Sequence, residues 1–304
     1  MSEGSTQPVS ASSAPVRADG RLAAGAFVGV LAALLVIGLS WEPTHLRGVR
    51  MLPHTVTGRF ALPEVGEPSG IAFHPGRQSL FVVGDGGGLA EVSLSGAALQ
   101  RRDLGLRNLE AVTVDPATGL IYVGVEEAEQ ILEVDPQTLD IARRFDIERI
   151  FDGRTVLAEG GAETGLEGLA FVPDAAHPEG GTFFILNQAF SDDDPNDASA
   201  ILEVEAPLRS STERRAPARI IRFWPGEIPD LSAAHWDAVR RRLWVASDQL
   251  NLVMLFNPES GAFEHRWRLP GVEQEGFTLD DAGHAWIAQD VGGLIRLRLD
   301  LPDE

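Results

Sequence analysis

The sequence predicts an all-β fold, a five-bladed β-propeller whose last blade is completed by a strand from the N-terminal side. Three observations predict it: a short motif that restarts five times, apolar runs separated by turn residues after each restart, and one strand missing from the last repeat. The restarts begin at Pro68, Leu109, Leu166, Leu231 and Gln274.

Each restart is followed by turn residues and then by further short apolar runs. In the second repeat, the turn Asp115–Gly119 leads to Ile121–Val125 and then to the alternating run Ile131–Val134. Short strands joined by turns, with no helical period, are typical of four-stranded antiparallel blades of about 40 to 45 residues. The two longer intervals are explained by insertions, at 150–163, Ser191–Ala198 and Arg209–Ala218.

The last repeat predicts how the ring closes. It ends after its third strand, Leu294–Leu299, while a strand without a repeat of its own, Val56–Pro63, precedes the first blade and resembles Glu264–Pro270. This strand would complete the last blade and remove two exposed sheet edges. A linear stack of repeats would not need it.

The N-terminal region predicts a membrane anchor. Residues 1–20 have the composition of a disordered tail, and Leu22–Leu39 is an uncharged apolar run long enough to span a bilayer. We therefore expect a transmembrane signal-anchor helix over 21–41, a linker over 42–54 and the propeller over 55–304. A cleaved signal peptide is the alternative, since Gly38 and Ser40 are small enough for a peptidase.

Orientation and location are predicted less directly, because arginines stand on both sides of the span, at 17 and 21 and at 47 and 50. A large domain after one N-terminal span is commonly exported. We expect a single-pass protein of the inner (cytoplasmic) membrane, with the propeller on the periplasmic or extracellular side and the membrane contacted through the N-terminal helix.

Composition excludes several classes of function. The formal charge is −20, all 25 basic residues are arginine and cysteine is absent. Such an acidic chain repels phosphate backbones, so we expect no nucleic-acid partner, and thiolate metal sites and cysteine nucleophiles are excluded. The acidity favours either cation binding or simple solubility.

The second position of each restart predicts a ring around the central channel, because equivalent positions of the inner strands face one another. Its members are Ser69, Glu110, Glu167, Ser232 and Glu275. Three converging carboxylates need a cation or protons among them, and hard oxygen donors select Ca²⁺, with Mg²⁺ or Mn²⁺ as weaker alternatives. The metal ligands predicted are Glu110, Glu167 and Glu275. In the alternative reading, these side chains pair with arginines or backbone amides and fix the blade register.

A second set of polar residues is expected on the same face, where the second strands end. It comprises Asp85, Glu126, Asn187, Asp248 and Gln289. With Ser69 and Ser232 they are the predicted ligand-binding residues, either completing the metal shell or holding a bound molecule.

The restart motifs also resemble a known family. Leu109–Val112, Gly165–Ala170 and Gln274–Gly276 resemble the SdiA-regulated family of bacterial propellers, over about residues 51–300, and the blade pattern is related to NHL-type and phytase-like propellers. The resemblance implies five blades, an anchored or exported protein and calcium held by the channel glutamates, which correspond here to Glu110, Glu167 and Glu275. It supplies no reaction.

Two classes of function therefore remain open. The first is a non-catalytic module that binds an unknown small molecule or protein at the channel face. The alternative is a calcium-dependent hydrolase of esters, lactones or phosphoesters, in which the ion activates water. No serine, histidine and aspartate set can be assembled from the sequence as a triad. A purely structural propeller without an ion is a third possibility.

Overall fold

The computed structural model describes residues 46, 48–126, 128–157, 165–188, 199–226 and 228–301. Residues 48–304 form one compact unit. The predicted tail and the predicted membrane helix over 21–41 lie outside the described residues. Within the described ranges, no helix is long and apolar enough to cross a bilayer.

The strands pair in antiparallel groups of four along the chain. The first two groups are β3 (Pro68–His74), β4 (Ser79–Gly84), β5 (Gly88–Ser93), β6 (Ala98–Asp103), and β7 (Leu109–Val114), β8 (Ile121–Val125), β9 (Gln130–Val134), β10 (Ile141–Ile147). The next two are β13 (Leu166–Pro173), β14 (Gly181–Asn187), β15 (Ala200–Glu205), β16 (Arg215–Pro225), and β17 (Leu231–Asp237), β18 (Arg242–Ser247), β19 (Leu252–Asn257), β20 (Ala262–Arg268). The last joins β21 (Gln274–Leu279), β22 (His284–Gln289) and β23 (Leu294–Leu299) to β2 (His54–Phe60).

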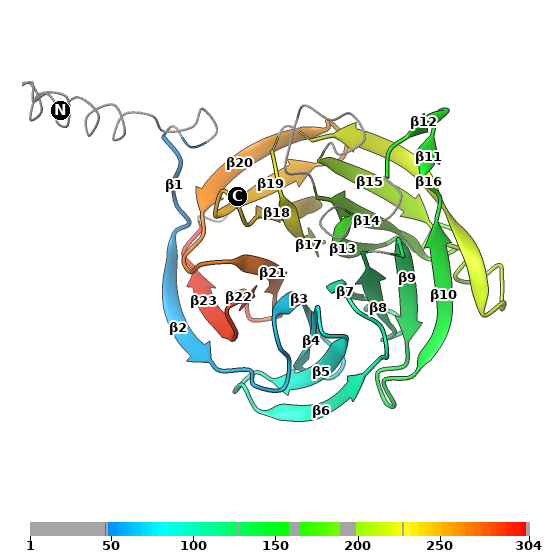
Figure 1. Ribbon diagram of the computed structural model, residues 1–304. Helices are drawn as coiled ribbons and strands as arrows, with labels where there is room; N and C mark the ends of the chain where they lie inside the picture. Colours follow the sequence, from blue (N-terminus) through cyan, green and yellow to red (C-terminus); the bar gives the residue numbers. More distant parts are fainter. Residues whose placement is uncertain are drawn as a thin grey trace, which may run out of the picture. The chain divides into compact units, whose positions relative to one another are not determined.

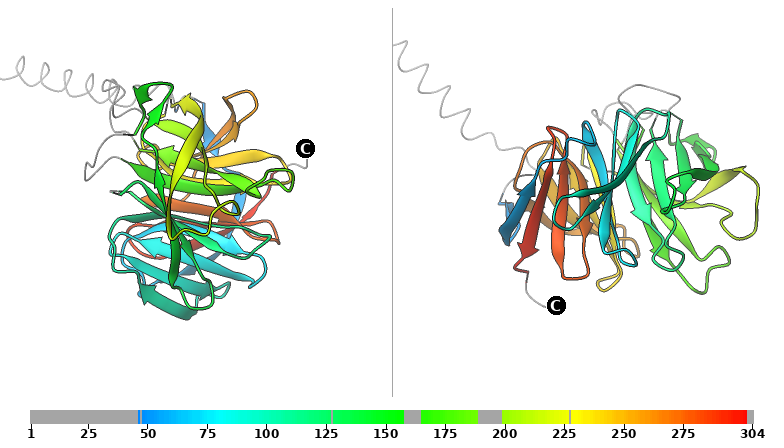
Figure 2. Two further views of the ribbon diagram at one scale, coloured as in Figure 1. Left: turned by 90° about the vertical axis from the view of Figure 1, so that its right-hand side faces the viewer. Right: turned by 90° about the horizontal axis from the view of Figure 1, so that it is seen from below.

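The first strand of each group lies innermost, and these strands form a closed ring. β3, β7, β13, β17 and β21 contact one another in that order, and β21 contacts β3 again (Figure 1). The side views in Figure 2 show the strands running between two faces that carry the connecting turns. The fold is all-β and propeller-like, as the repeats predicted.

The pairing of β2 confirms the predicted role of the strand before the first repeat. β2 is antiparallel to β23, from His54 opposite Leu299 to Phe60 opposite Leu294. The Phe60 ring stacks on Trp286 with 5.4 Å between ring centroids. Residues from the two ends of the unit therefore share one sheet and one aromatic cluster.

Three segments predicted to be linker or insertion take part in sheets. β1 (Arg50–Met51) pairs in parallel with β20, and Leu52 after it is 1% exposed in the core, although both fall in the predicted linker 42–54. The start of β16, within the predicted insertion Arg209–Ala218, pairs in parallel with β10. In the 150–163 insertion, Ile150–Phe151 and Arg154–Thr155 form the hairpin β11–β12. The predicted insertion Ser191–Ala198 lies outside the described residues.

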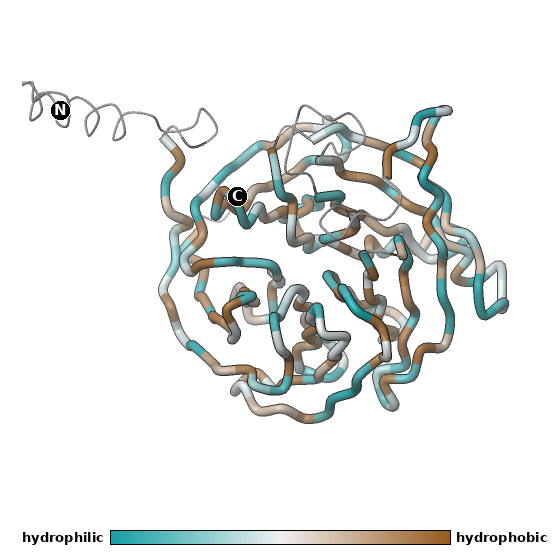
Figure 3. Tube along the Cα trace, in the orientation of Figure 1, coloured by the Kyte–Doolittle hydropathy of each residue, from teal (hydrophilic) through white to brown (hydrophobic). Residues whose placement is uncertain are grey.

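The core lies between neighbouring sheets, where the second strands are packed on both faces. Every residue of β4, β8 and β14 is buried. Trp244 and Trp286 are the largest fully buried side chains. The outer strands mix hydrophilic and hydrophobic residues, because only one of their faces meets the core (Figure 3).

Candidate functional site

A β-bulge near the start of every inner strand carries the predicted ring residue. The pairing of each first strand with its second strand skips Ser69, Glu110, Glu167 and Glu275, and in the fourth group it skips Ser232 together with Ala233. A bulged residue leaves the ladder and re-aims its side chain. Four of the ring positions therefore share the same pairing geometry, and the fourth group has a longer irregularity at the same place.

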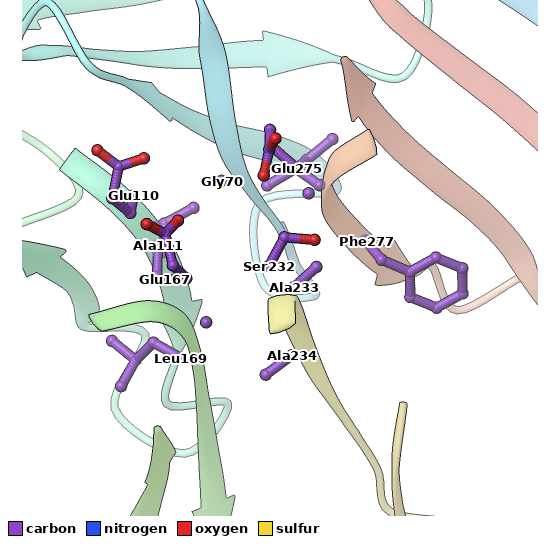
Figure 4. A pocket seen from close by; sticks show the side chains of 14 residues that line it. Gly70, Glu110, Ala111, Glu167, Leu169, Ser232, Ala233, Ala234, Glu275 and Phe277 are labelled. Carbon is purple, nitrogen blue, oxygen red and sulfur yellow. The ribbon is translucent and has the colours of Figure 1, made fainter. Parts of the chain in front are cut away.

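Four of these residues line one small cavity at the centre of the ring. Glu110, Glu167, Ser232 and Glu275 come from β7, β13, β17 and β21, and Figure 4 shows their side chains around the opening. The volume open to the centre of a water-sized sphere is about 10 Å³, which is room for about one water molecule or ion. We call this end of the ring the channel mouth.

Glycine at the next position allows the inner strands to approach this closely. A Cβ on Gly70 would lie 2.8 Å from Glu110 O and 2.9 Å from Ala111 Cα. A Cβ on Gly276 would lie 2.9 Å from Ile71 N. Backbone atoms cannot move aside as a flexible side chain can, so a larger residue would force the strands apart and widen the ring.

The carboxylates at the channel mouth hold one another's pKa values high. Burial is the largest cause for Glu110, followed by repulsion from Asp85 and Glu126, and it raises the pKa of Glu110 from 4.5 to about 9. Burial also raises the pKa of Glu167 well above its usual value, and Glu110, Glu126 and Glu275 act in the same direction. Each charge is thus unfavourable for the others.

The same holds on the opposite side of the ring. Burial raises the pKa of Glu275 to about 9, and the largest further contributions come from Asp248 and Asp230. The pKa of Asp248 and that of Asp290 are themselves raised, mainly by burial. The dominant influences on the three ring glutamates are therefore burial and other carboxylates, with no arginine among them.

The predicted second set lies partly at the same mouth. Ser69 Oγ donates to Asp85 Oδ1 at 2.5 Å, which joins a member of each set. Asp248 Oδ1 accepts a hydrogen bond from Gln274 N at 2.7 Å, and Ser232 Oγ donates to Gln274 O at 3.1 Å. Both residues of the fourth group therefore also position the start of β21.

The remaining members differ in their surroundings. Glu126 is 4% exposed and acts on the pKa values of Glu110 and Glu167, so it belongs to the channel mouth. Asn187 is buried at the end of β14. Gln289 donates from Nε2 to Val272 O at 2.6 Å and thereby holds the loop before β21.

Two further buried residues near the ring positions were not predicted from the sequence. Asp230 is 5% exposed, accepts hydrogen bonds from Gln188 Nε2 at 3.0 Å and Gln249 N at 2.6 Å, and repels Glu167 and Glu275. It lies two residues before a ring position, as Glu67, Asn108 and Glu273 do, and all four have a positive φ of 48° to 54°. This polar residue two positions before the ring residue is the sequence feature from which Asp230 could have been predicted.

Gln274 is the second residue that sequence reasoning missed. It is 1% exposed, and neither its Nε2 nor its Oε1 has a hydrogen-bond partner among the described residues. The equivalent positions are Pro68, Leu109, Leu166 and Leu231, so a buried amide replaces an apolar side chain only here. An unsatisfied buried amide next in sequence to Glu275 is costly.

The oxygen atoms at the channel mouth are suitable ligands for a hard cation, but their present arrangement does not form a complete metal site. The side chains of the four ring residues that line the cavity offer only oxygen atoms as ligands, and the buried carboxylates need compensation. Across the described residues, however, no three histidine, aspartate or glutamate side chains already converge closely enough to hold an ion. Binding would therefore require the ring glutamates to come closer together.

Comparison with solved structures supports the fold. The crystal structure of glutaminyl cyclase from Myxococcus xanthus aligns with a TM-score of 0.57 and 12% identity, over 84% of this chain and 99% of that protein. The Cps50 (Swd1) β-propeller domain from Myceliophteria thermophila has a TM-score of 0.47 and 8% identity, over 81% of this chain and all of that one. At such identities the likeness concerns the fold alone.

No curated protein matches the sequence. The sequence model of the SdiA-regulated family matches residues 61–290, which is most of the chain and includes all five ring positions. This match confirms the family predicted from the restart motifs. The chain belongs to the SdiA-regulated family.

Proposed function

We propose that the ring is a five-bladed propeller that binds one Ca²⁺ at the channel mouth, with Glu110, Glu167 and Glu275 as ligands. The observation that carries the proposal is the gathering of these carboxylates around one cavity, where burial and then neighbouring carboxylates raise their pKa values. Ca²⁺ accepts six to eight oxygens in flexible geometry, whereas Mg²⁺ demands a near-ideal octahedron. Ligands from three separate strands suit the more tolerant ion.

The module acts, in this proposal, by binding a ligand or protein partner at the face that carries the ion. The ion joins strands β7, β13 and β21, and so stiffens the inner ring where polar residues of the second set surround it. The excess of acids over arginines disfavours nucleic acid as that partner.

Elemental analysis combined with thermal melting tests the ion site. We expect about one Ca²⁺ per chain after dialysis against dilute calcium, and a melting temperature about 5–10 °C higher with Ca²⁺ at 100 times its dissociation constant than with chelator. Mg²⁺ at the same concentration serves as the ion control. A chain without bound metal, whose melting is the same in both buffers, would contradict the proposal.

A catalytic role, in which the ion would activate water, is the second candidate. The aligned protein from Myxococcus xanthus is titled an enzyme, a glutaminyl cyclase. For a non-catalytic module we expect no calcium-dependent turnover of a panel of p-nitrophenyl esters, lactones and phosphoesters. Turnover that is lost in the Glu167→Gln variant would establish the hydrolase instead.

We further propose that residues 21–41 anchor the propeller to the inner membrane from its periplasmic or extracellular side. The support is the uncharged apolar run Leu22–Leu39. The full chain should stay in the membrane pellet after alkaline carbonate washing, and a variant lacking residues 21–41 should not. Recovery of the full-length chain in the carbonate supernatant would refute the anchor.

A further inference from the structure

The face opposite the channel mouth holds a second and much larger cavity. Its volume is about 480 Å³, and it lies at the far ends of the inner strands, among the turns that follow them. Phe73, Phe171, Trp236 and Val239 supply much of its apolar wall. We call it the hairpin-face cavity. Its size and mainly apolar lining are those of a small-molecule site.

One polar group in this cavity is the imidazole of His235. Thr278 Oγ1 accepts a hydrogen bond from Phe73 N at 3.2 Å and lies 3.2 Å from His235 Nδ1. We take the threonine hydroxyl as the donor to Nδ1, an assignment that places the ring proton on Nε2. Burial lowers the pKa of His235 to about 4, against the opposing effect of Asp237, so the ring is neutral at pH 7.

A second donor comes from Thr113. Its Oγ1 accepts a hydrogen bond from Phe171 N at 3.0 Å, and the side chain is only partly buried where it lines the cavity. The hydroxyl proton is thus available to a bound molecule. The cavity presents two neutral donors, one from β7 and one from β17.

The carboxylates on the rim already accept hydrogen bonds from neighbouring side chains, and Asp281 does so from Gln78 Nε2 at 2.8 Å. Asp237 Oδ2 bonds Arg240 at 3.0 Å and the Trp244 indole at 3.2 Å, and Asp280 Oδ2 accepts from the Trp286 indole at 3.0 Å. These carboxylates disfavour an anion. A cation would find donors where it needs acceptors, so a neutral molecule fits best.

We propose that the hairpin-face cavity binds a small neutral organic molecule, with an aromatic or branched apolar body and a carbonyl-type oxygen that accepts hydrogen bonds from His235 and Thr113. The apolar body contacts Phe73, Phe171 and Trp236. This site is separate from the channel mouth and does not depend on the proposed ion.

Ligand-observed NMR on the full chain in lipid nanodiscs tests the proposal with three matched probes: benzamide, benzoate and benzylamine. Empty nanodiscs give the background. Benzamide should bind best, because it alone combines a neutral charge with a carbonyl acceptor. Thr113→Val, which removes one donor without changing volume, and His235→Phe should each weaken benzamide about 3- to 10-fold.

A steric pair of variants separates binding from folding. Ala238 and Ala282 are both exposed in turns after inner strands, but only Ala238 lines the cavity. Ala238→Trp should fill the opening and weaken benzamide more than about 10-fold, while Ala282→Trp should change it less than about 2-fold. Benzoate or benzylamine binding best, no binding of benzamide at 10 mM, or equal affinity in the two tryptophan variants would overturn the proposal.

Discussion

The variant Glu110→Gln/Glu167→Gln/Glu275→Gln is expected to melt higher than the natural protein in chelator at pH 8, and lower in excess calcium. Without an ion, the natural carboxylates must stay protonated or repel one another, and the amides remove that cost. A gain of about 2 kcal/mol, discounted for the partial exposure of Glu275, corresponds to about 4–8 °C. With calcium, only the natural protein gains binding free energy.

The pH dependence of stability tests independently whether the ring carboxylates destabilise the protein without calcium. The folded-state pKa values of Glu110 and Glu275 are raised from 4.5 to about 9. Their contribution to the free energy of unfolding is complete below pH 4.5 and is lost as pH rises through 9. Between these pH values the folded state retains protons that the unfolded chain has released, so rising pH favours unfolding. In chelator, the natural protein should therefore lose stability between pH 5 and 9, and the triple variant should lose less.

A matched control carries the same change of charge on the surface. Glu148, Glu213 and Glu259 are exposed, so replacing all three by glutamine alters net charge without touching the channel mouth. This control should follow the natural protein in calcium, in chelator and across pH. If it behaved as the ring variant does, net charge alone would explain the result and the ring account would be wrong.

The second large effect concerns closure of the ring. The fragment 61–304 begins where the family match begins, but lacks β2, so β23 is left with an unpaired edge and Trp286 loses its contact with Phe60. We expect fragment 48–304 to melt cooperatively and fragment 61–304 to aggregate or melt without a cooperative transition. Circular dichroism melting and size-exclusion chromatography provide the readout.

A peptide of residues 48–62 added to fragment 61–304 supplies the missing strand in trans. It should restore part of the cooperative melting, while a peptide with Phe60→Asp should not, because the aspartate cannot stack on Trp286. A fragment 61–304 as stable as 48–304 would show that β2 does not close the ring.

The fold was largely predictable because each repeat carries its own strand and turn signals. The pairing of β2 with β23 followed from counting strands in the last repeat, since an unpaired edge needs a partner. The parallel pairing of β10 with β16, and of β1 with β20, was not predictable. Both depend on where the ring brings chain segments together, which local patterns do not encode.

The candidate site was predictable in its ring residues but not in its backbone geometry. Equivalent positions of a repeat meet around its axis, which is why Glu110, Glu167 and Glu275 could be named from spacing. The bulges that aim them, and the positive φ of Asp230, are features of the assembled sheet. His235 and Thr113 both occupy the fifth position of a restart, so their facing one another could have been predicted; the hairpin-face cavity between them was missed because its walls are formed by turns that only the assembled ring brings together.

The most direct test of the calcium site is a crystal structure of the protein grown with calcium, with anomalous scattering used to locate the ion. We expect one ion at the channel mouth, about 2.3–2.6 Å from carboxylate oxygens of Glu110, Glu167 and Glu275. A channel mouth without an ion at millimolar calcium, or an ion held elsewhere while these three side chains remain apart, would contradict it.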